Sequence, residues 1–457
     1  MKFIPAALSF QIPLAEGPIS VGDYVVMASL PENFGSRRLV LLVCFFTATI
    51  LTFQAIRIWV ADYRVHSDQI DQMERGAALE PENAAAWDRL GRARATNLEN
   101  LDPAGAVADF EQAVARVPLS ATYWMDLANG YEAIGNVPLA RKAFARARAS
   151  YPASALVAWG YGNFLLRQND YDEGFAQIKQ ALQADSKLVP LAVSRVWHLN
   201  QDADLLLNQV LPANQDAYFQ AIDFMQENRQ PSAALVIWQR LLSLGKPFEL
   251  RRSFPLLWLL IQSDRAEDAS RVWREALAAA GLPHNEPANQ SLIWNGDFAR
   301  DFLNGGLDWR WSFPFGASIG FDTAPPSSAG RSLRLDFSGG ANLDLMEPLQ
   351  FVPVEPSRRY HFHAAVKTEG ITTENGISFL ISDPNNGAAM LTTENLIGTR
   401  AWTPVDIDYT TAPVTHFLSI QVRRAPSRLF ENKLSGTAWI GDVSLVASNG
   451  AGQPQSK

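Results

Sequence analysis

The stretch from Trp124 to Pro152, WMDLANGYEAIGNVPLARKAFARARASYP, decides the fold of the N-terminal half. Large and small side chains recur in it at fixed spacings: W-x2-L-A-x2-Y is followed by A-x3-F-x2-A and then proline. Small residues let two antiparallel helices approach closely, large residues fill the space between them, and proline ends the second helix. The spacing therefore predicts a helical hairpin whose aromatic side chains pack in its core.

The same pattern recurs with a period of about 34 residues. Downstream, the small-residue positions hold Gly162, Gly174 and Ala181. Upstream, Trp87, Leu90 and Gly91 begin an earlier repeat. Its second half is delayed by three residues, which an insertion at 98–103 explains; this half contains Ala106, Phe110, Ala113 and Pro118. Later, a triplet with a central tryptophan recurs after 35 residues, first as Ala234, Trp238 and Leu241, then as Ala269, Trp273 and Ala276. Between 186 and 217 the sequence predicts helix without a clean repeat.

These residues resemble the tetratricopeptide repeat, with Ala128 where glycine is commonest. The resemblance covers roughly residues 70–280 and predicts an α-solenoid over 68–282. It implies a concave face that binds a protein partner, and a scaffolding or assembly role without chemistry.

An apolar segment precedes the repeats. LVLLVCFFTATILTFQAI (39–56) has no charged residue and as a helix would span roughly 27 Å, close to the thickness of a bilayer core. Arg57, Trp59 and Tyr63 beyond it suit an interface. We predict a transmembrane signal-anchor helix over 37–63 that contacts the membrane through residues 39–60. A buried soluble helix and a cleaved signal peptide are the alternatives.

Basic residues are slightly more frequent before this segment than after it. We therefore expect a single-pass protein of the bacterial inner membrane, with residues after about 63 in the periplasm. Met27 is an alternative start. In that case residues 1–26 of the N-terminal segment (1–36) lie upstream of the true protein.

The composition of the chain argues against two further classes of protein. The chain has 457 residues, a formal net charge of -8 and a pI of about 5.4, so nothing points to nucleic-acid binding. Cys44 is the single cysteine, which excludes an intrachain disulfide.

The character of the chain changes after a predicted linker at 283–290. Short runs of alternating apolar and polar residues follow, separated by Gly, Pro, Asn and Asp; they are 332–337, 360–368, 376–382, 404–410, 416–424 and 437–446. Their number and spacing predict an antiparallel β-sandwich, a jelly roll, over 291–447. We expect residues 448–457 to form a disordered tail.

Four motifs in this region carry a second resemblance: NGDF (295–298), YHFHAAVKT (360–368), WTPVDIDY (402–409) and WIGDVSL (439–445). Together they resemble carbohydrate-binding modules with a galactose-binding-like jelly roll. The resemblance implies that NGDF is the first strand and lies beside the last one.

In such modules sugars stack on aromatic rings. Trp309, Trp311, Phe313 and Phe315 would share one face of an extended chain and are the glycan-binding candidates. The alternative is that this face is the sandwich core, and Trp402 is expected to be a core residue.

The resemblance also implies a structural Ca²⁺ near the terminal strands. Asp442 occupies the acidic position near the end, and Asp297 or its backbone would contribute. The family often has an acid directly after the opening Phe, where this chain has Ala299. No other cofactor is expected.

A few other motifs in the sequence have a possible catalytic or metal-binding interpretation as well as a purely structural one. The G-x-S-x-G match at 316–320 precedes two prolines and cannot start the helix of a nucleophile elbow. His361 and His363 share a strand face, as do Asp406 and Asp408, and both pairs are expected to be surface polar groups. No phosphate-loop, dinucleotide or HExxH motif occurs.

The sequence thus predicts a membrane-anchored, non-enzymatic scaffold of a bacterial cell envelope. The solenoid would bind a protein and the sandwich a glycan, in export or assembly of a surface polysaccharide. Two alternatives are a pure protein scaffold with a degenerate sandwich, and an accessory to, or a cryptic, glycoside hydrolase.

Overall fold

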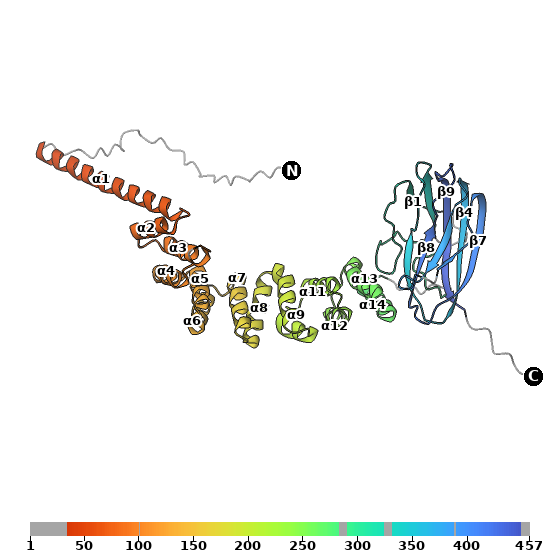
Figure 1. The fold of residues 1–457 in the computed structure, drawn as a ribbon, viewed down its shortest axis with the longest axis horizontal. Helices are drawn as coiled ribbons and strands as arrows, with labels where there is room; N and C mark the ends of the chain where they lie inside the picture. The colour runs from red at the N-terminus through yellow and green to blue at the C-terminus, as the bar shows by residue number, and fades with distance from the viewer. Residues whose placement is uncertain (1–33, 100, 283–289, 324–330, 388–389, 449–457) are drawn as a thin grey trace, which may run out of the picture. The chain divides into compact units, whose positions relative to one another are not determined.

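The computed structural model describes residues 34–99, 101–282, 290–323, 331–387 and 390–448 (Figure 1). It divides into two compact units, residues 1–150 and 151–457, each of which is described by itself. Residues 283–289 of the expected linker (283–290), residues 1–33 of the N-terminal segment (1–36) and residues 449–457 of the expected tail (448–457) lie outside the described residues.

The first unit contains a long helix followed by shorter ones. The helices are α1 Phe34–Val65, α2 Ile70–Leu79, α3 Ala84–Thr96, α4 Pro103–Arg116, α5 Ala121–Ala133 and α6 Val137–Ser150. Within α1, Arg38–Val65 is long and apolar enough to cross a bilayer, and its most apolar window is not buried by the rest of the chain. The end of α1 does pack: Ala61 and Val65 are buried against α2, where Gly76 leaves room for them.

The hairpins α3–α4 and α5–α6 form where the repeat pattern predicts. Side chains of Asn83, Asp102 and Ser120 cap three of these helices by accepting from backbone N–H groups. Trp87 Nε1 donates to the Pro81 carbonyl at 2.9 Å, and Trp124 Nε1 donates to Pro118 at 2.8 Å. These two bonds therefore tie Trp87 and Trp124 to the turn that leads into their helices.

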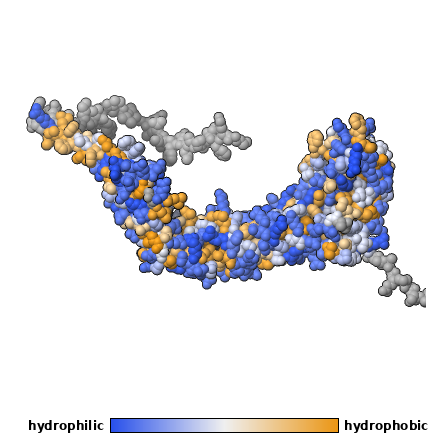
Figure 2. Space-filling model, viewed as in Figure 1, coloured by the Kyte–Doolittle hydropathy of each residue, from blue (hydrophilic) through white to orange (hydrophobic). Residues whose placement is uncertain are grey.

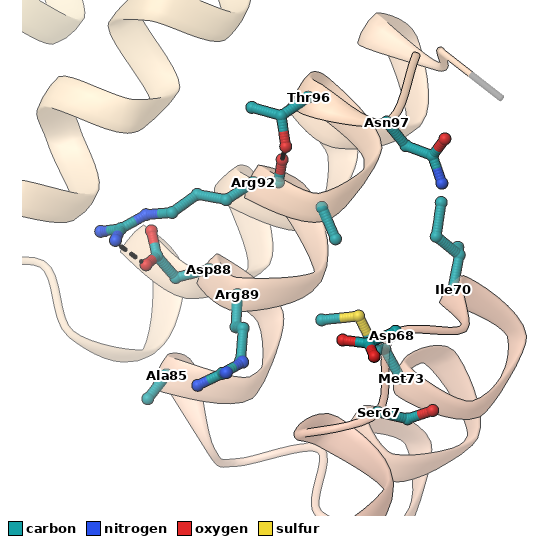
Figure 3. A pocket seen from close by; sticks show the side chains of 11 residues that line it. Ser67, Asp68, Ile70, Met73, Ala85, Asp88, Arg89, Arg92, Thr96 and Asn97 are labelled. Atoms are coloured by element: carbon teal, nitrogen blue, oxygen red, sulfur yellow. Dashed lines mark hydrogen bonds and ion pairs between the residues drawn. The ribbon is translucent and has the colours of Figure 1, made fainter. Parts of the chain in front are cut away.

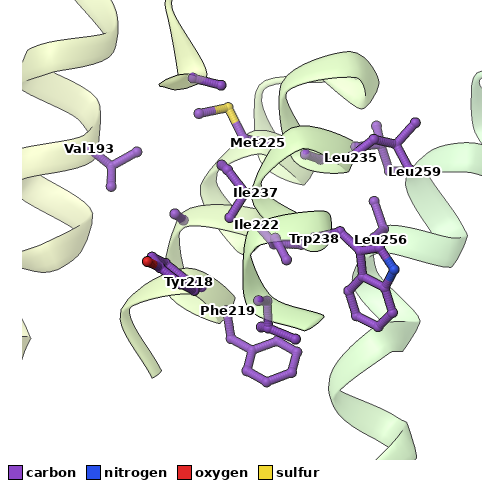
Figure 4. Packing of buried hydrophobic residues seen from close by; sticks show 14 of the residues in the cluster. Val193, Tyr218, Phe219, Ile222, Met225, Leu235, Ile237, Trp238, Leu256 and Leu259 are labelled. Carbon is purple, nitrogen blue, oxygen red and sulfur yellow. The ribbon is translucent and has the colours of Figure 1, made fainter. Parts of the chain in front are cut away.

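The second unit continues the helical hairpins. Its helices are α7 Ala155–Arg167, α8 Tyr171–Ala184, α9 Val189–Leu199, α10 Ala203–Leu205, α11 Gln215–Glu227, α12 Pro231–Leu242, α13 Phe254–Gln262 and α14 Ala266–Ala279. The region without a clean repeat is irregular, because a 3₁₀ turn (Ser186–Leu188) precedes α9 and a π-turn (Leu206–Val210) extends α10. A continuous core joins these helices around the fully buried Trp238 (Figure 4).

The C-terminal domain is an antiparallel sandwich of two sheets, as predicted. Its strands are β1 Ala317–Asp322, β2 Ser332–Ser338, β3 Leu349–Pro353, β4 Arg359–Ile371, β5 Ser378–Ser382, β6 Met390–Thr392, β7 Gly398–Thr410, β8 Phe417–Arg423 and β9 Ser435–Ala447. The orders are β1-β2-β9-β4-β7 and β3-β8-β5-β6. The sequence missed β1, β3 and β6. In β3 a buried Gln350 interrupts the apolar face, because its amide bonds the backbone of Trp294 at 2.9 and 2.8 Å.

The opening NGDF is not a strand, contrary to our expectation. It does lie beside the last strand, since Leu292 donates to Leu445 at 2.8 Å and Val443 donates to Gly296 at 2.9 Å. Side chains hold this segment in turns instead. The Asn295 amide bonds both backbone groups of Arg300, at 3.0 and 2.9 Å.

The sandwich packs on the last helical hairpin through the outer face of its β3-β8-β5-β6 sheet. Trp258 of α13 contacts Phe351 of β3, with ring centroids 5.8 Å apart, and the Arg310 guanidinium lies 4.9 Å from the Trp258 ring. Asp264, in the turn between α13 and α14, accepts from Asn385 at 2.9 Å and contacts His416 Nδ1 at 2.7 Å. Polar bonds thus surround an aromatic contact.

Substitution of two glycines tests how tightly the sandwich packs on the last helical hairpin. Gly306 and Gly370 have nearly the same positive φ, 62° and 63°. A Cβ at Gly306 would lie 2.4 Å from the Trp273 ring, whereas a Cβ at Gly370 would meet nothing within 4 Å. We expect Gly370→Ala to cost about 1 kcal/mol from backbone strain, and Gly306→Ala about 2–4 kcal/mol in the free energy of unfolding. Urea unfolding of the full chain measures both. Equal losses of unfolding free energy in the two variants would show that the side chains around Gly306 move easily to accommodate a Cβ.

Candidate functional site

A pocket of about 630 Å³ opens between α2 and α3 (Figure 3). Residues from the turn after α1, from α2, from α3 and from the turn after α3 line it. They combine apolar side chains (Ile70, Met73, Ala85, Ala93) with polar ones (Ser67, Asp68, Asp88, Arg89, Arg92, Thr96, Asn97). Mixed apolar and polar lining suits a ligand with both kinds of group.

Charges on one side of this pocket form a network between repeats. Arg92 of α3 donates to Asp126 of α5 at 2.7 and 3.1 Å, across 34 residues or one repeat period. The same guanidinium lies 2.9 Å from Asp88 Oδ2. Asp88 is 5% exposed, and its Oδ1 receives no hydrogen bond from the described part of the chain. One guanidinium therefore faces two carboxylates, and one buried oxygen lacks a donor.

This arrangement raises the pKa of Asp88 to about 7. Burial is the largest cause, and the charge of Asp126 adds to it, while Arg92 opposes both. The Asp88 carboxyl consequently changes charge near neutral pH. The tetratricopeptide resemblance predicted a concave binding face but not this residue, because an acid within W-D-R-L reads as an exposed helix position.

The structure places the four glycan-binding candidates in two different environments. Trp309 and Trp311 are 1% and 4% exposed and belong to the sandwich core. Phe313 and Phe315 are 72% and 86% exposed. The four do not share a face, because the backbone of Phe313 is left-handed and residues 315–316 form a turn, so the chain is not extended here. The tryptophans therefore present no ring to a ligand.

Phe313 is held in an unfavourable backbone conformation. Its φ is 58°, a left-handed value that costs an aromatic residue about 1–2 kcal/mol. The preceding Ser312 donates to the Glu347 carboxylate from its backbone N–H (2.6 Å) and from its hydroxyl (2.9 Å). These bonds fix the turn that holds the two phenylalanines outward.

The residues proposed for Ca²⁺ lie near each other in the fold, since Gly296 and Val443 are hydrogen-bonded. Asp297 is exposed and accepts from the Ala299 N–H at 3.2 Å. Asp442 has a φ of 54°. Over the described ranges no group of three His, Cys, Asp or Glu is placed to hold a metal ion. The calcium expectation therefore stays a prediction.

Histidines and aspartates alternate across β4 and β7 on an exposed sheet face. His363 Nδ1 lies 2.7 Å from Asp406, and His361 lies 3.2 Å from Asp406 and 3.0 Å from Asp408. Hydrogen bonds from His363 to Asp406, and from Arg359 and His361 to Asp408, hold the pKa of both carboxyls below its usual value. A general acid needs a raised pKa, so this pair is suited to a solvated ladder rather than to acid catalysis.

Sequence reasoning missed an aromatic group on the same sheet face. Trp439 of β9 is half-buried, and its Nε1 donates to Asp322 at 2.7 Å. Arg334 bonds Asp322 and Asp336 at 3.0 and 2.9 Å, and the Lys367 ammonium lies 4.5 Å from the ring centroid. Alternation along WIGDVSL gives the signal, since Ala438 and Ile440 point inward.

Comparison with known proteins supports the helical assignment. A sequence model of the tetratricopeptide repeat matches residues 125–188. The chain contains tetratricopeptide repeats there, and the hairpins around them have the same form. No curated protein matches the chain in sequence.

Solved structures resemble each half separately. A crystal structure of MamA is 14% identical, covering 38% of this chain and 85% of that one, with a TM-score of 0.26. A structure described as "CBM4 structure and function" is 14% identical, covering 34% and 99%, with a TM-score of 0.25. The CBM22-1-GH10 modules of a Clostridium thermocellum xylanase are 8% identical, covering 29% and 25%, with a TM-score of 0.22. At these scores the resemblances carry no argument about function.

The raised pKa of Asp88 predicts a pH-dependent stability. Between its ordinary value of 3.8 and about 7, the folded chain keeps a proton on Asp88 that the unfolded chain has released. Stability therefore falls as pH rises through this window. Asp88→Asn should remove that loss, so the Tm of the variant relative to wild type should increase from pH 5 to pH 8.

Asp109 is the matched control, because burial raises its pKa only to about 6. Asp109→Asn should give a similar gain centred at lower pH. Thermal melts of the full chain at several pH values measure both effects. A Tm difference for Asp88→Asn that does not change with pH would contradict the assignment.

Proposed function

We propose that this chain is a membrane-anchored, non-enzymatic scaffold of a bacterial cell envelope, acting in export or assembly of a surface polysaccharide. In this proposal α1 anchors it in the inner membrane, with the repeats and the sandwich in the periplasm. The observation that carries the proposal is the pocket at Asp88, because tetratricopeptide hairpins are built to hold a protein segment between them.

The chemistry of the pocket suits an extended peptide. The exposed Arg89, which lines the pocket, would donate to a carbonyl or carboxylate of the peptide. Met73 and Ile70 supply apolar surface for a side chain between them. A peptide offers donors, acceptors and apolar groups at such spacings.

The outer face of the β1-β2-β9-β4-β7 sheet is the candidate glycan surface in this proposal. Trp439 offers a flat ring, and Arg334, Asp336 and Lys367 offer hydrogen bonds around it. Lys367 lies over the ring, and an exposed cation–π contact costs only about 0.5–1 kcal/mol to displace. The opposite sheet is less suitable, because α13 and α14 cover part of it.

A scaffold whose sandwich binds no sugar is the second candidate function. The burial of Trp309 and Trp311 favours it, because it removes two of the four aromatic candidates on which the sugar interpretation of the sequence depended. A glycoside hydrolase finds no support in the Asp406–Asp408 pair, whose pKa values are lowered.

Site-specific photocrosslinking in cells tests the pocket. A photoreactive residue at Ala85, which lines the pocket, should capture a protein partner, whereas the same residue at the 95%-exposed Leu98 should not. Charge reversal by Arg89→Glu should reduce the Ala85 product severalfold, because it changes the pocket without touching the core. Equal capture at both positions would refute the pocket as the binding site.

A glycan array with the full chain in detergent tests the sandwich. Binding that is lost in Trp439→Ala and kept in Arg359→Ala, at the far end of the same sheet, would support sugar recognition. We expect a loss of at least tenfold, since one stacked ring contributes about 1.5–3 kcal/mol. Absence of binding in the wild-type chain would instead favour the scaffold without sugar.

A further inference from the structure

The loops at one end of the sandwich carry apolar side chains that the core does not use. β1 and β9 begin at this end, and β2 and β8 finish there. Two of the loops, 312–316 and 424–434, are therefore close in space although more than one hundred residues separate them. The loop between β2 and β3 joins them, because Ser338 donates to Gly316 at 3.1 Å and Leu434 donates to Ala341 at 3.0 Å.

Four side chains in these two loops form what we call the tip patch: Phe313, Phe315, Leu429 and Phe430. They are 72%, 86%, 59% and 101% exposed. Figure 2 shows hydrophobic surface at the upper end of the sandwich. A side chain as exposed as Phe430 contacts almost nothing in its own chain, so its apolar surface contributes nothing to the stability of the fold.

The loops that carry the tip patch are held by specific bonds. Ser312 is fixed to Glu347, as described above. The Asn342 side chain bonds both backbone groups of Ser427 at 2.9 Å, and the Ser427 hydroxyl donates to Glu374 at 2.7 Å. These bonds therefore hold the phenylalanines outward. They also keep Phe313 in its unfavourable backbone conformation.

The chemistry of the tip patch distinguishes among ligands. Sugar and protein surfaces commonly use Tyr or Trp, whose polar atoms remain hydrogen-bonded, and the tip patch has only Phe and Leu. Its side chains stand out from loops instead of lining a cleft. Protruding side chains that carry only hydrocarbon groups are suited to a fluid hydrocarbon environment. The exposed Arg428 directly precedes Leu429, and the exposed Lys433 follows Phe430 by three residues, with the exposed acid Glu431 between them. The two basic side chains suit lipid phosphates at the boundary of the tip patch.

We propose that the tip patch inserts into a lipid surface, with the phenylalanines in the headgroup–acyl boundary and Arg428 and Lys433 at the headgroups. The same chain has a helix long and apolar enough to cross a bilayer, and in the proposed function this helix anchors the chain beside lipid. Among the helices of the second unit, Asp264 makes its polar contacts, with Asn385 and His416, at loops on the opposite end of the sandwich from the tip patch. This would give the chain a second membrane contact, independent of α1.

Depth-dependent fluorescence quenching in the full chain tests this proposal. Cys44→Ser removes the native thiol, and Glu431→Cys places an environment-sensitive dye beside the tip patch. The chain is held in nanodiscs so that α1 is already embedded. Doxyl lipid is placed either in the nanodisc or in added vesicles of phosphatidylcholine with phosphatidylglycerol. We expect quenching and a blue shift in at least one of the two arrangements.

The matched control places the dye at Val414→Cys, which is 61% exposed and lies in a loop at the opposite end of the sandwich. It should not be quenched. Phe315→Ser with Phe430→Ser should lower the apparent vesicle partition at least tenfold for each residue. Arg428→Ser with Lys433→Ser should lower it about fivefold per charge, and only when phosphatidylglycerol is present.

Three outcomes would overturn the proposal. One is no quenching at position 431 in either arrangement. Another is equal quenching at 431 and 414, which would show nonspecific adsorption. The third is a blue shift caused by added polysaccharide without quenching by lipid, which would make the tip patch a sugar site. Unchanged thermal melts of the serine variants would confirm that they fold.

Discussion

A row of helical hairpins buries apolar surface only between neighbours, so the last hairpin must be covered by something else. Here the sandwich covers it. Phe417 and Leu307 of the sandwich are buried in the same core as Trp238 and Trp273 of the solenoid. Side chains on the outer face of the β3-β8-β5-β6 sheet thus belong to the apolar core of the helices, while the space between the two sheets has a core of its own. The polar contacts of Asp264 lie beside this contact.

The sandwich therefore has one surface that packs against helices and other surfaces that face solvent. Its β3-β8-β5-β6 sheet packs on the last helical hairpin. The other sheet displays Trp439 and the histidine–aspartate ladder, and one end displays the tip patch. In the first unit, the pocket at Asp88 lies between α2 and α3, and Arg92 in its lining also bonds Asp126 of the next repeat. The chemistry available to the protein therefore lies in polar networks on repeat and strand faces, and over the described ranges no metal cluster accompanies them.

Much of the fold was predictable because packing imposes periodic patterns. Gly91 fits against Phe110, and Gly162 against Ile178, where the repeat requires small residues. Long strands alternate clearly. The failures occurred where side chains replace regular hydrogen bonding. The NGDF segment is held in turns by the Asn295 side chain and not by the backbone hydrogen bonds of a β-sheet. β3 was missed because the buried Gln350 is polar and breaks the alternation of apolar and polar residues.

The candidate site was less predictable for a related reason. Burial of Trp309 and Trp311 depends on turns at 303–316, in which Asn304 accepts from the Trp311 N–H and Asp308 from the Leu303 N–H. No periodicity marks such turns. The importance of Asp88 depends on Asp126 one repeat away, a neighbour that spacing suggests only once the repeat is known. The tip patch is invisible to pattern analysis, because exposure is a property of the assembled loops.

The shared core also determines where this protein can be divided. Although the sequence places the domain boundary at the linker (283–290), the apolar core of the helices extends from α13 and α14 to side chains of β3 and β8. The same core runs without a break from α8 to α14. A recombination event or an engineered chimera that cut the chain at the linker, or between two of these helices, would expose part of this core. The heritable module is therefore the sandwich together with the helices of the second unit.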